Sequence, residues 1–217
     1  MHIVEGFLPF EWCIIWFVLS IIAIVIGIVQ LRRLGSDVPE TKRFLAINAV
    51  VMFVASLFKL PAVEGCPANV PFNTLSGSFL GPAITSVIVA IVLLLQAFLL
   101  GYGGLTTLGA NIFSMGVVGP LAACIVYHFA NKANISNIIS IILAVIFANL
   151  FTILTAAIQF GLVYGRILMF FVILLINQIP LVVLDIIITV IVYFAVTKLF
   201  GDSKIFSLDF NEFFSVK

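Results

Sequence analysis

The chain has 217 residues, of which 64% are apolar and only 9% charged, and its formal net charge is +1. Typical soluble domains carry about 25% charged residues, so a chain this apolar could not cover its core with a polar surface in water. We therefore expect an integral membrane protein with a single domain, 1–217. The balanced charge gives no indication of a nucleic-acid partner.

The N-terminus, Met1 to Pro9, lacks the basic region of a secretory signal and should stay attached. The amine of Met1, the backbone amide nitrogen of His2 and its imidazole can all reach one metal ion. Nitrogen ligands in a plane suit Ni(II), Cu(II) or, less commonly, Co(II). Removal of Met1 should be poor before a residue as bulky as His2, so this amine is expected in the mature chain. A histidine at position two of an arbitrary protein is nevertheless usually an accident.

The apolar stretches predict an all-α bundle of about seven membrane spans. A Pro- and Gly-rich stretch, 60–77, predicts a loop between the second and third spans. The long stretch 167–200 is divided at Pro180, because proline removes one helical hydrogen bond and disfavours helix just before it. The spans are expected at about 10–31, 44–58, 79–100, 105–129, 135–164, 167–178 and 180–199.

The positive charges favour this division into seven spans. Cytoplasmic loops of membrane proteins carry an excess of Lys and Arg. With seven spans, eight of the ten Lys and Arg residues share one side and only Lys59 and Lys132 lie on the other, whereas six spans divide them equally. We therefore expect the N-terminus and the 60–77 loop outside and the C-terminus in the cytoplasm. The Phe-rich tail, 201–217, could lie on the membrane surface, dock on a partner or fray.

Three residues within the spans are candidates to line a pocket. Asn111 needs hydrogen-bonding partners in an apolar environment and should face the bundle interior, with Met115 one turn further on the same face. Asp185 is the only carboxylate deep in an apolar run, and it could bind a cation, take a proton or anchor an amide such as Asn177 or Gln178. The sequence contains no Ser/His/Asp set, no HExxH and no phosphate-binding loop, so we do not expect an enzyme.

Two stretches of the sequence resemble one family. They are the first nine residues, MHIVEGFLP, and the run 103–116, GGLTTLGANIFSMG, which is followed by Gly119-Pro120. Both are similar to the substrate-capture subunit (S component) of energy-coupling-factor cobalt and nickel transporters, the CbiM/NikM type. The resemblance implies capture of Co2+ or Ni2+, as transported substrate, by the amine of Met1, the amide and imidazole of His2 and a second histidine in the outer loop. It also implies a coupling transmembrane subunit, two ATPase subunits and often a small two-span accessory protein.

The outer loop departs from this pattern because it contains no histidine. Residues 65–73 read GCPANVPFN, and the second of the two histidines, His128, lies in a later span. Asn69 or Asn73 could supply a carbonyl oxygen instead, Cys66 could supply a thiolate that favours softer metals, or water could fill the position.

The predicted function is therefore the substrate-specific component of an ATP-driven cobalt uptake transporter in the plasma membrane, supplying cobalt for cobalamin biosynthesis. ATP hydrolysis would take place on separate partner subunits. The alternatives are a nickel or other small-solute capture subunit with an altered site, and a membrane scaffold without transport activity.

Overall fold

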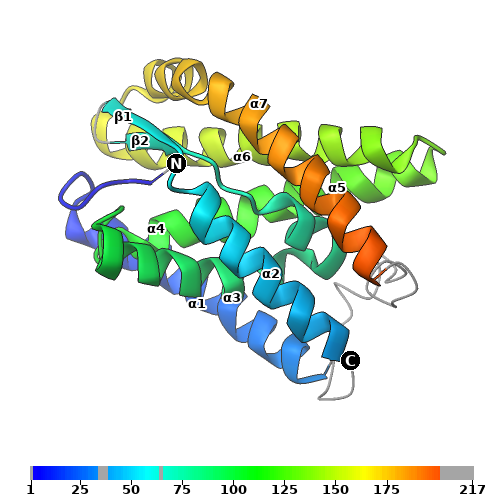
Figure 1. Ribbon diagram of the computed structural model, residues 1–217. Helices are drawn as coiled ribbons and strands as arrows, with labels where there is room; N and C mark the ends of the chain where they lie inside the picture. The colour runs from blue at the N-terminus through cyan, green and yellow to red at the C-terminus, as the bar shows by residue number, and fades with distance from the viewer. Residues whose placement is uncertain (1, 34–38, 64–65, 201–217) are drawn as a thin grey trace.

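The computed structural model describes residues 2–33, 39–63 and 66–200, and it consists of helices with one small antiparallel hairpin (Figure 1). Met1 and the predicted tail 201–217 lie outside the described residues. The elements in chain order are α1 (Phe10–Arg33), α2 (Pro39–Ala55), β1 (Lys59–Val63), β2 (Cys66–Asn69), α3 (Thr74–Leu100), α4 (Leu108–Ile112), the π-helical segment η1 (Phe113–Val118), α5 (Gly119–Lys132), α6 (Asn137–Tyr164) and α7 (Ile167–Phe200).

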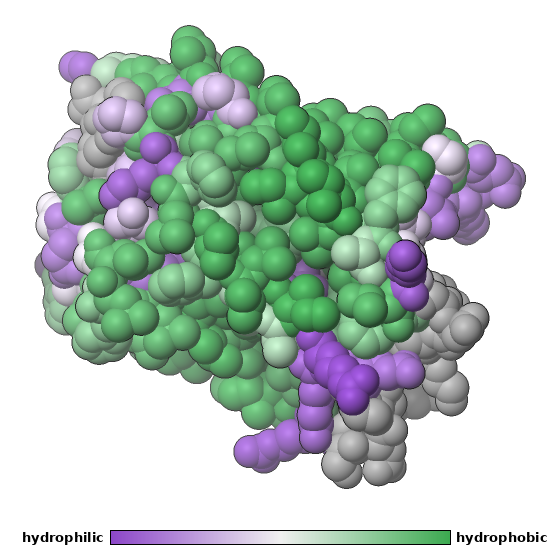
Figure 2. Space-filling view, in the orientation of Figure 1, coloured by the Kyte–Doolittle hydropathy of each residue, from purple (hydrophilic) through white to green (hydrophobic). Residues whose placement is uncertain are grey.

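The described part of the chain contains five helices that are long and apolar enough to cross a membrane: Phe10–Arg33, Thr74–Leu100, Leu108–Lys132, Asn137–Tyr164 and Ile167–Phe200. The third of these combines α4, η1 and α5. The 17 residues of α2 fall short of the about 20 that a membrane span needs. Figure 2 shows apolar side chains over the middle of the molecule and hydrophilic ones gathered toward two ends. The prediction of a helical membrane protein is confirmed.

The predicted division of the last apolar stretch into two spans is wrong. α7 continues through Pro180, and Figure 1 shows its axis changing direction between the yellow and orange parts without a break. Proline removes one backbone hydrogen bond, which a helix tolerates when neighbouring elements pack against it. One face of α7 packs along its whole length, because buried residues recur every three or four positions: Phe170, Leu174, Gln178, Leu181, Asp185, Thr189, Tyr193, Val196 and Phe200.

The 60–77 stretch, predicted as one outer loop, has two parts with different positions. The first forms the hairpin of β1 and β2. The second, residues 70–81, is buried throughout and leads the chain through the interior. At the far end of this passage the Phe79 ring contacts the rings of Phe44, Tyr127 and Tyr193. These partners lie near the start of α2 and near the ends of α5 and α7.

The rest of α3 then runs back to the end of the bundle from which the passage came. Gly81, at φ 80°, interrupts the helical backbone there. Gln96, near the C-terminal end of α3, contacts His2, so α3 ends where α1 begins. Within its described residues the chain therefore enters the bundle interior at residues 70–80, between α2 and the rest of α3, in addition to its five long apolar helices.

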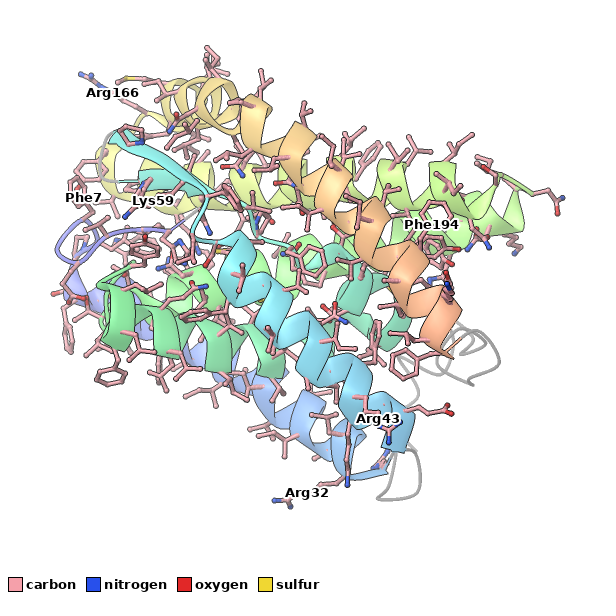
Figure 3. The ribbon with its side chains drawn as sticks, viewed as in Figure 1. Phe7, Arg32, Arg43, Lys59, Arg166 and Phe194 are labelled. Atoms are coloured by element: carbon pink, nitrogen blue, oxygen red, sulfur yellow. The ribbon has the colours of Figure 1, made fainter. Side chains whose placement is uncertain are left out.

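The ends of the bundle differ in charge. Lys59 and Arg166 lie at the end that contains His2, whereas Arg32 and Arg43 lie at the other (Figure 3). The described Lys and Arg residues at that other end number six: Arg32, Arg33, Lys42, Arg43, Lys132 and Lys198. Within the bundle, Lys132 therefore lies at the end of Arg32 and Arg166 at the end of Lys59, which is the reverse of the expected grouping. The sequence predicted an additional change of direction at Pro180, whereas the structure has it at residues 70–80. Each helix between these two points therefore runs in the direction opposite to the one expected.

This arrangement predicts that Lys132 and Arg166 lie on opposite sides of the membrane, with Arg166 on the side of Lys59. The variants Lys132→Cys, Arg166→Cys and Lys59→Cys can be labelled with a membrane-impermeant maleimide in sealed vesicles of known orientation. Arg166→Cys and Lys59→Cys should react from one side and Lys132→Cys only from the other. The background should be low, because the native cysteines are buried: Cys13, Cys66 and Cys124. Labelling of Lys132→Cys together with Lys59→Cys would contradict the passage through the interior.

Candidate metal site

The N-terminal residues lie inside the bundle, not on its surface. His2 is 2% exposed and Ile3 is 1% exposed. The carboxamide of Asn111 on α4 pairs with the backbone of Ile3: its Oδ1 accepts the Ile3 N–H at 2.7 Å, and its Nδ2 donates to the Ile3 carbonyl at 3.1 Å. The Thr107 hydroxyl donates to the same carbonyl at 2.8 Å. Asn111 thus faces the interior, and through Ile3 it determines where His2 lies.

The His2 backbone and ring are each held by a different element. Its N–H donates to the Pro67 carbonyl on β2 at 3.3 Å. Its imidazole Nε2 lies 2.9 Å from Oε1 of Gln96 on α3, and the side chain of Asn69 on β2 lies within hydrogen-bonding range of the same ring. Burial lowers the pKa of His2 to about 3. The imidazole is therefore neutral at physiological pH, which is the form that binds metal ions.

The turn after α3 lies against the His2 ring. The ring centroid of Tyr102 is 6.4 Å from that of His2, and the Lys59 ammonium lies 3.7 Å from the Tyr102 centroid. Gly103 has a φ of 72°, and a Cβ there would lie 3.5 Å from His2 Cδ2 and 3.1 Å from Asn111 Nδ2. Glycine therefore allows the turn both its backbone conformation and its close approach to the site.

Cys66 and Asn69, the two loop residues predicted as ligands, both lie on β2 and are buried. Burial raises the pKa of the Cys66 thiol to about 12, so the thiol is protonated and a metal would have to displace that proton. Asn69 offers a neutral amide next to the His2 ring and needs no such step. Its backbone carbonyl accepts a hydrogen bond from Gln178 Nε2 at 2.8 Å, which ties this strand to α7.

Met115 and Asn73 lie deeper in the bundle than His2. Met115, on η1, packs in the larger apolar core, whereas Ile3 packs in a separate cluster. The Met115 carbonyl accepts a hydrogen bond from Asn73 Nδ2. The structure thus places these two residues together along the internal passage, not at the N-terminus.

Asp185 is fully buried on α7 and is held by neutral side chains. Its carboxylate accepts hydrogen bonds from Asn149 Nδ2 at 2.8 Å and from the Thr189 hydroxyl at 3.2 Å. Gln178 Nε2 lies 3.4 Å from the Asn149 oxygen and also donates to the Asn69 carbonyl. Asp185 therefore anchors an amide, but that amide is Asn149 and not the expected Asn177 or Gln178. Hydrogen bonds connect Asp185 to the strand next to His2 through Asn149 and Gln178.

A metal bound at His2 would depend on backbone nitrogens and amide groups. Among the residues described, no three His, Cys, Asp or Glu side chains lie together as a metal cluster. His128 cannot contribute, because its ring contacts Tyr127 edge to face at the opposite end of the bundle. The donors near the imidazole are the His2 amide nitrogen and the Asn69 carboxamide. Imidazole and amide donors of this kind suit divalent transition metals such as nickel and copper and, less commonly, cobalt.

Gln96 and Ser56 contribute to this site but were not among the predicted site residues. The Gln96 amide contacts His2 through its oxygen Oε1, and its nitrogen Nε2 donates to the Ser56 hydroxyl oxygen at 2.6 Å. A signal was present, since Gln96 is the single polar residue in the apolar run 87–100. Polar residues in such runs usually face a partner or a site.

The chain is similar to known proteins over most of its length. Residues 2–202 match the CbiM family, described as the cobalt uptake substrate-specific transmembrane region. A putative cobalt transport protein CbiM of Methanocaldococcus jannaschii is 44% identical over 208 residues, which cover 93% of this chain and 89% of the relative. The cobalt transport protein CbiM of Streptococcus sanguinis is 39% identical over 201 residues, covering 89% of this chain and 82% of the relative.

The fold is also shared with a solved structure. A crystal structure of a transition metal transporter superposes with a TM-score of 0.79 at 22% sequence identity, covering 95% of this chain and 97% of that one. Because the family match extends over nearly the whole sequence, the chain belongs to the CbiM family of cobalt uptake substrate-specific transmembrane components.

Proposed function

We propose that the chain captures Co2+ with its own N-terminus at the outer face of the cell membrane, for an ATP-driven uptake transporter that supplies cobalamin biosynthesis. The ligands are the amine of Met1 and the amide and imidazole nitrogens of His2. The observation that carries the proposal is the position of His2, which holds a neutral imidazole and a backbone amide inside the bundle. Three nitrogens of one short segment can approach a metal in a plane, an arrangement that suits Ni2+ or Cu2+ and, less commonly, Co2+.

Coordination by the His2 amide has a consequence for the hairpin. The N–H of His2 donates to the Pro67 carbonyl, and an amide nitrogen that binds a metal has lost this proton. Metal capture would therefore release the Pro67 carbonyl, which must then find water or another donor. The hydrogen bonding of the hairpin would therefore differ between the metal-free and the metal-bound site.

The charge distribution supports an outward position for the His2 end. Of the described Lys and Arg residues, six lie at the opposite end and only Lys59 and Arg166 at this one. Cytoplasmic loops carry the excess of positive charge. The His2 end therefore faces outward and α7 ends at the cytoplasmic side, which is the predicted orientation reached by a different path of the chain.

Asn69 is the preferred candidate for the position opposite His2. Its side chain already lies at the imidazole and is buried, and its amide oxygen can bind without losing a proton. Cys66 is the second candidate, and its thiol must first be deprotonated. Water is the third, since a metal that lacks a protein ligand keeps part of its hydration shell.

Transport requires partners that supply energy. The sequence contains no phosphate-binding loop, so ATP hydrolysis falls to other subunits. We propose a complex with a coupling transmembrane subunit, two ATPase subunits and, in cobalt systems, a small two-span accessory protein. Ni2+ is the second candidate substrate, because a deprotonated amide and an imidazole in one plane also suit nickel.

The first prediction concerns the two histidines of the chain. His2→Ala should abolish Co2+ binding in isothermal titration calorimetry on purified protein, because it removes the imidazole ligand. His128→Ala is the matched control and should bind normally, since His128 lies at the opposite end of the bundle. Unchanged affinity in His2→Ala would reject capture by the N-terminus, and no binding by the wild-type chain would favour another solute or a scaffold role.

The second prediction separates the candidates opposite His2. Asn69→Ala should weaken Co2+ binding, whereas Cys66→Ala should leave both the affinity and the visible spectrum of bound Co2+ unchanged. A thiolate ligand would add a sulfur-to-cobalt charge-transfer band. Such a band in the wild-type protein, lost in Cys66→Ala, would assign the position to Cys66. Normal affinity in both variants would assign it to water.

A further inference from the structure

Three buried side chains form a series of hydrogen bonds that ends at the His2 ring. Ser56 follows α2, Gln96 lies on α3, and the exposed fractions of Ser56, Gln96 and His2 are 1%, 1% and 2%. Ser56 Oγ lies 2.6 Å from the Phe53 carbonyl, Gln96 Nε2 lies 2.6 Å from Ser56 Oγ, and His2 Nε2 lies 2.9 Å from Gln96 Oε1. At this burial, no exposed surface is left from which bulk water could supply a missing donor or acceptor.

The direction of this series is determined at its first member. A backbone carbonyl can only accept, so the single hydroxyl proton of Ser56 is donated to Phe53. The Ser56 oxygen must then act as the acceptor for Gln96, which turns the amide NH2 toward Ser56 and the amide oxygen toward His2. The opposite orientation of the Gln96 amide would require Ser56 to give up its bond to Phe53.

The tautomer of His2 follows from this direction. The amide oxygen of Gln96 cannot donate, so the ring nitrogen that faces it, Nε2, must carry the proton. A neutral imidazole has one N–H, and therefore Nδ1 keeps its lone pair. Nδ1 is also the ring nitrogen nearer the backbone of its own residue. It can join the His2 amide nitrogen on one metal through a small chelate ring, which Nε2 cannot reach.

We propose that Gln96 and Ser56 are positioning residues for metal capture, which hold His2 as the Nε2-protonated tautomer and thereby present Nδ1 to the metal. This inference rests on the proposed function, in which His2 binds Co2+. Metal-binding histidines generally donate their other ring N–H to a fixed acceptor, which orients the ring and sets the tautomer. Here the acceptor is an amide whose own orientation is set by a hydroxyl at the end of α2.

The tautomer can be measured without any metal. The chain has only two histidines, so 15N-histidine labelling gives two ring systems, and His128→Gln identifies the signals of His2. In the metal-free wild-type protein, long-range 1H–15N spectra should show a protonated Nε2 and an unprotonated Nδ1. Gln96→Glu retains an acceptor and should keep this pattern. Gln96→Leu removes the acceptor and should give a mixture of tautomers.

Co2+ titration of the same variants then tests the role in capture. Gln96→Leu should bind Co2+ about 10- to 100-fold more weakly, the usual effect of losing such a partner, and Gln96→Glu should restore most of the affinity. Thermal unfolding of each variant shows whether the fold is retained. If Gln96→Leu does not fold, Ser56→Ala replaces it. That change frees the Gln96 amide to turn, and it should give mixed tautomers with a smaller loss of affinity.

The outcomes distinguish this inference from the function on which it rests. A protonated Nδ1 in the wild-type protein would overturn the inference, and so would a Gln96→Leu variant with the wild-type tautomer and affinity. A wild-type chain that shows the Nε2-protonated tautomer but binds no Co2+ would instead reject the proposed function.

Discussion

Backbone N–H and C=O groups inside an apolar bundle must find partners, because no water reaches them there. This chain carries non-helical backbone into its interior at several places, and buried amide side chains satisfy it. Asn111 pairs with the backbone of Ile3, and Gln178 donates to the Asn69 carbonyl. In the turn after α3 the partner is itself backbone, since the main-chain carbonyl of Gln96 accepts the N–H groups of Gly101 and Tyr102. Without these partners the N-terminus, the hairpin strand and the turn after α3 could not meet around His2.

The same amides connect the candidate metal site around His2 to the rest of the bundle. Asn69 and Gln178 lead from the hairpin to Asn149, and Asn149 donates to Asp185 in the middle of α7. Burying a carboxylate costs free energy unless it is hydrogen-bonded. Asp185 therefore keeps its hydrogen-bonding partners, which fixes the inner end of this series of hydrogen bonds. The hairpin is thus hydrogen-bonded to α7 through the Asn69 carbonyl and to the N-terminus through the Pro67 carbonyl, which accepts the His2 N–H.

The internal passage of residues 70–80 explains the main error of the topology prediction. The hydropathy pattern and the positive charges predicted about seven membrane spans, whereas five helices of the described residues are long and apolar enough to cross a membrane. The additional passage was placed at Pro180, because proline is the most visible interruption in the sequence. The internal passage is short, with residues 70–73 outside helices and residues 74–80 forming the first turns of α3 before the interruption at Gly81, so it shows no separate apolar stretch of membrane length. Lys132 and Arg166 were misplaced for this reason.

The sequence by itself determined the membrane class, most helix boundaries, the family resemblance and the suspicion that His2 binds a metal, because hydropathy, helix-ending residues and short motifs are local properties of the chain. It also indicated that Asn111 faces the interior, since a carboxamide in an apolar run needs partners. Only the tertiary structure decided what those partners are. His2 and Gln96 are separated by 94 positions, and Ile3 and Asn111 by 108. No local pattern specifies contacts over such separations, because they depend on how the helices pack and on the direction in which each one runs.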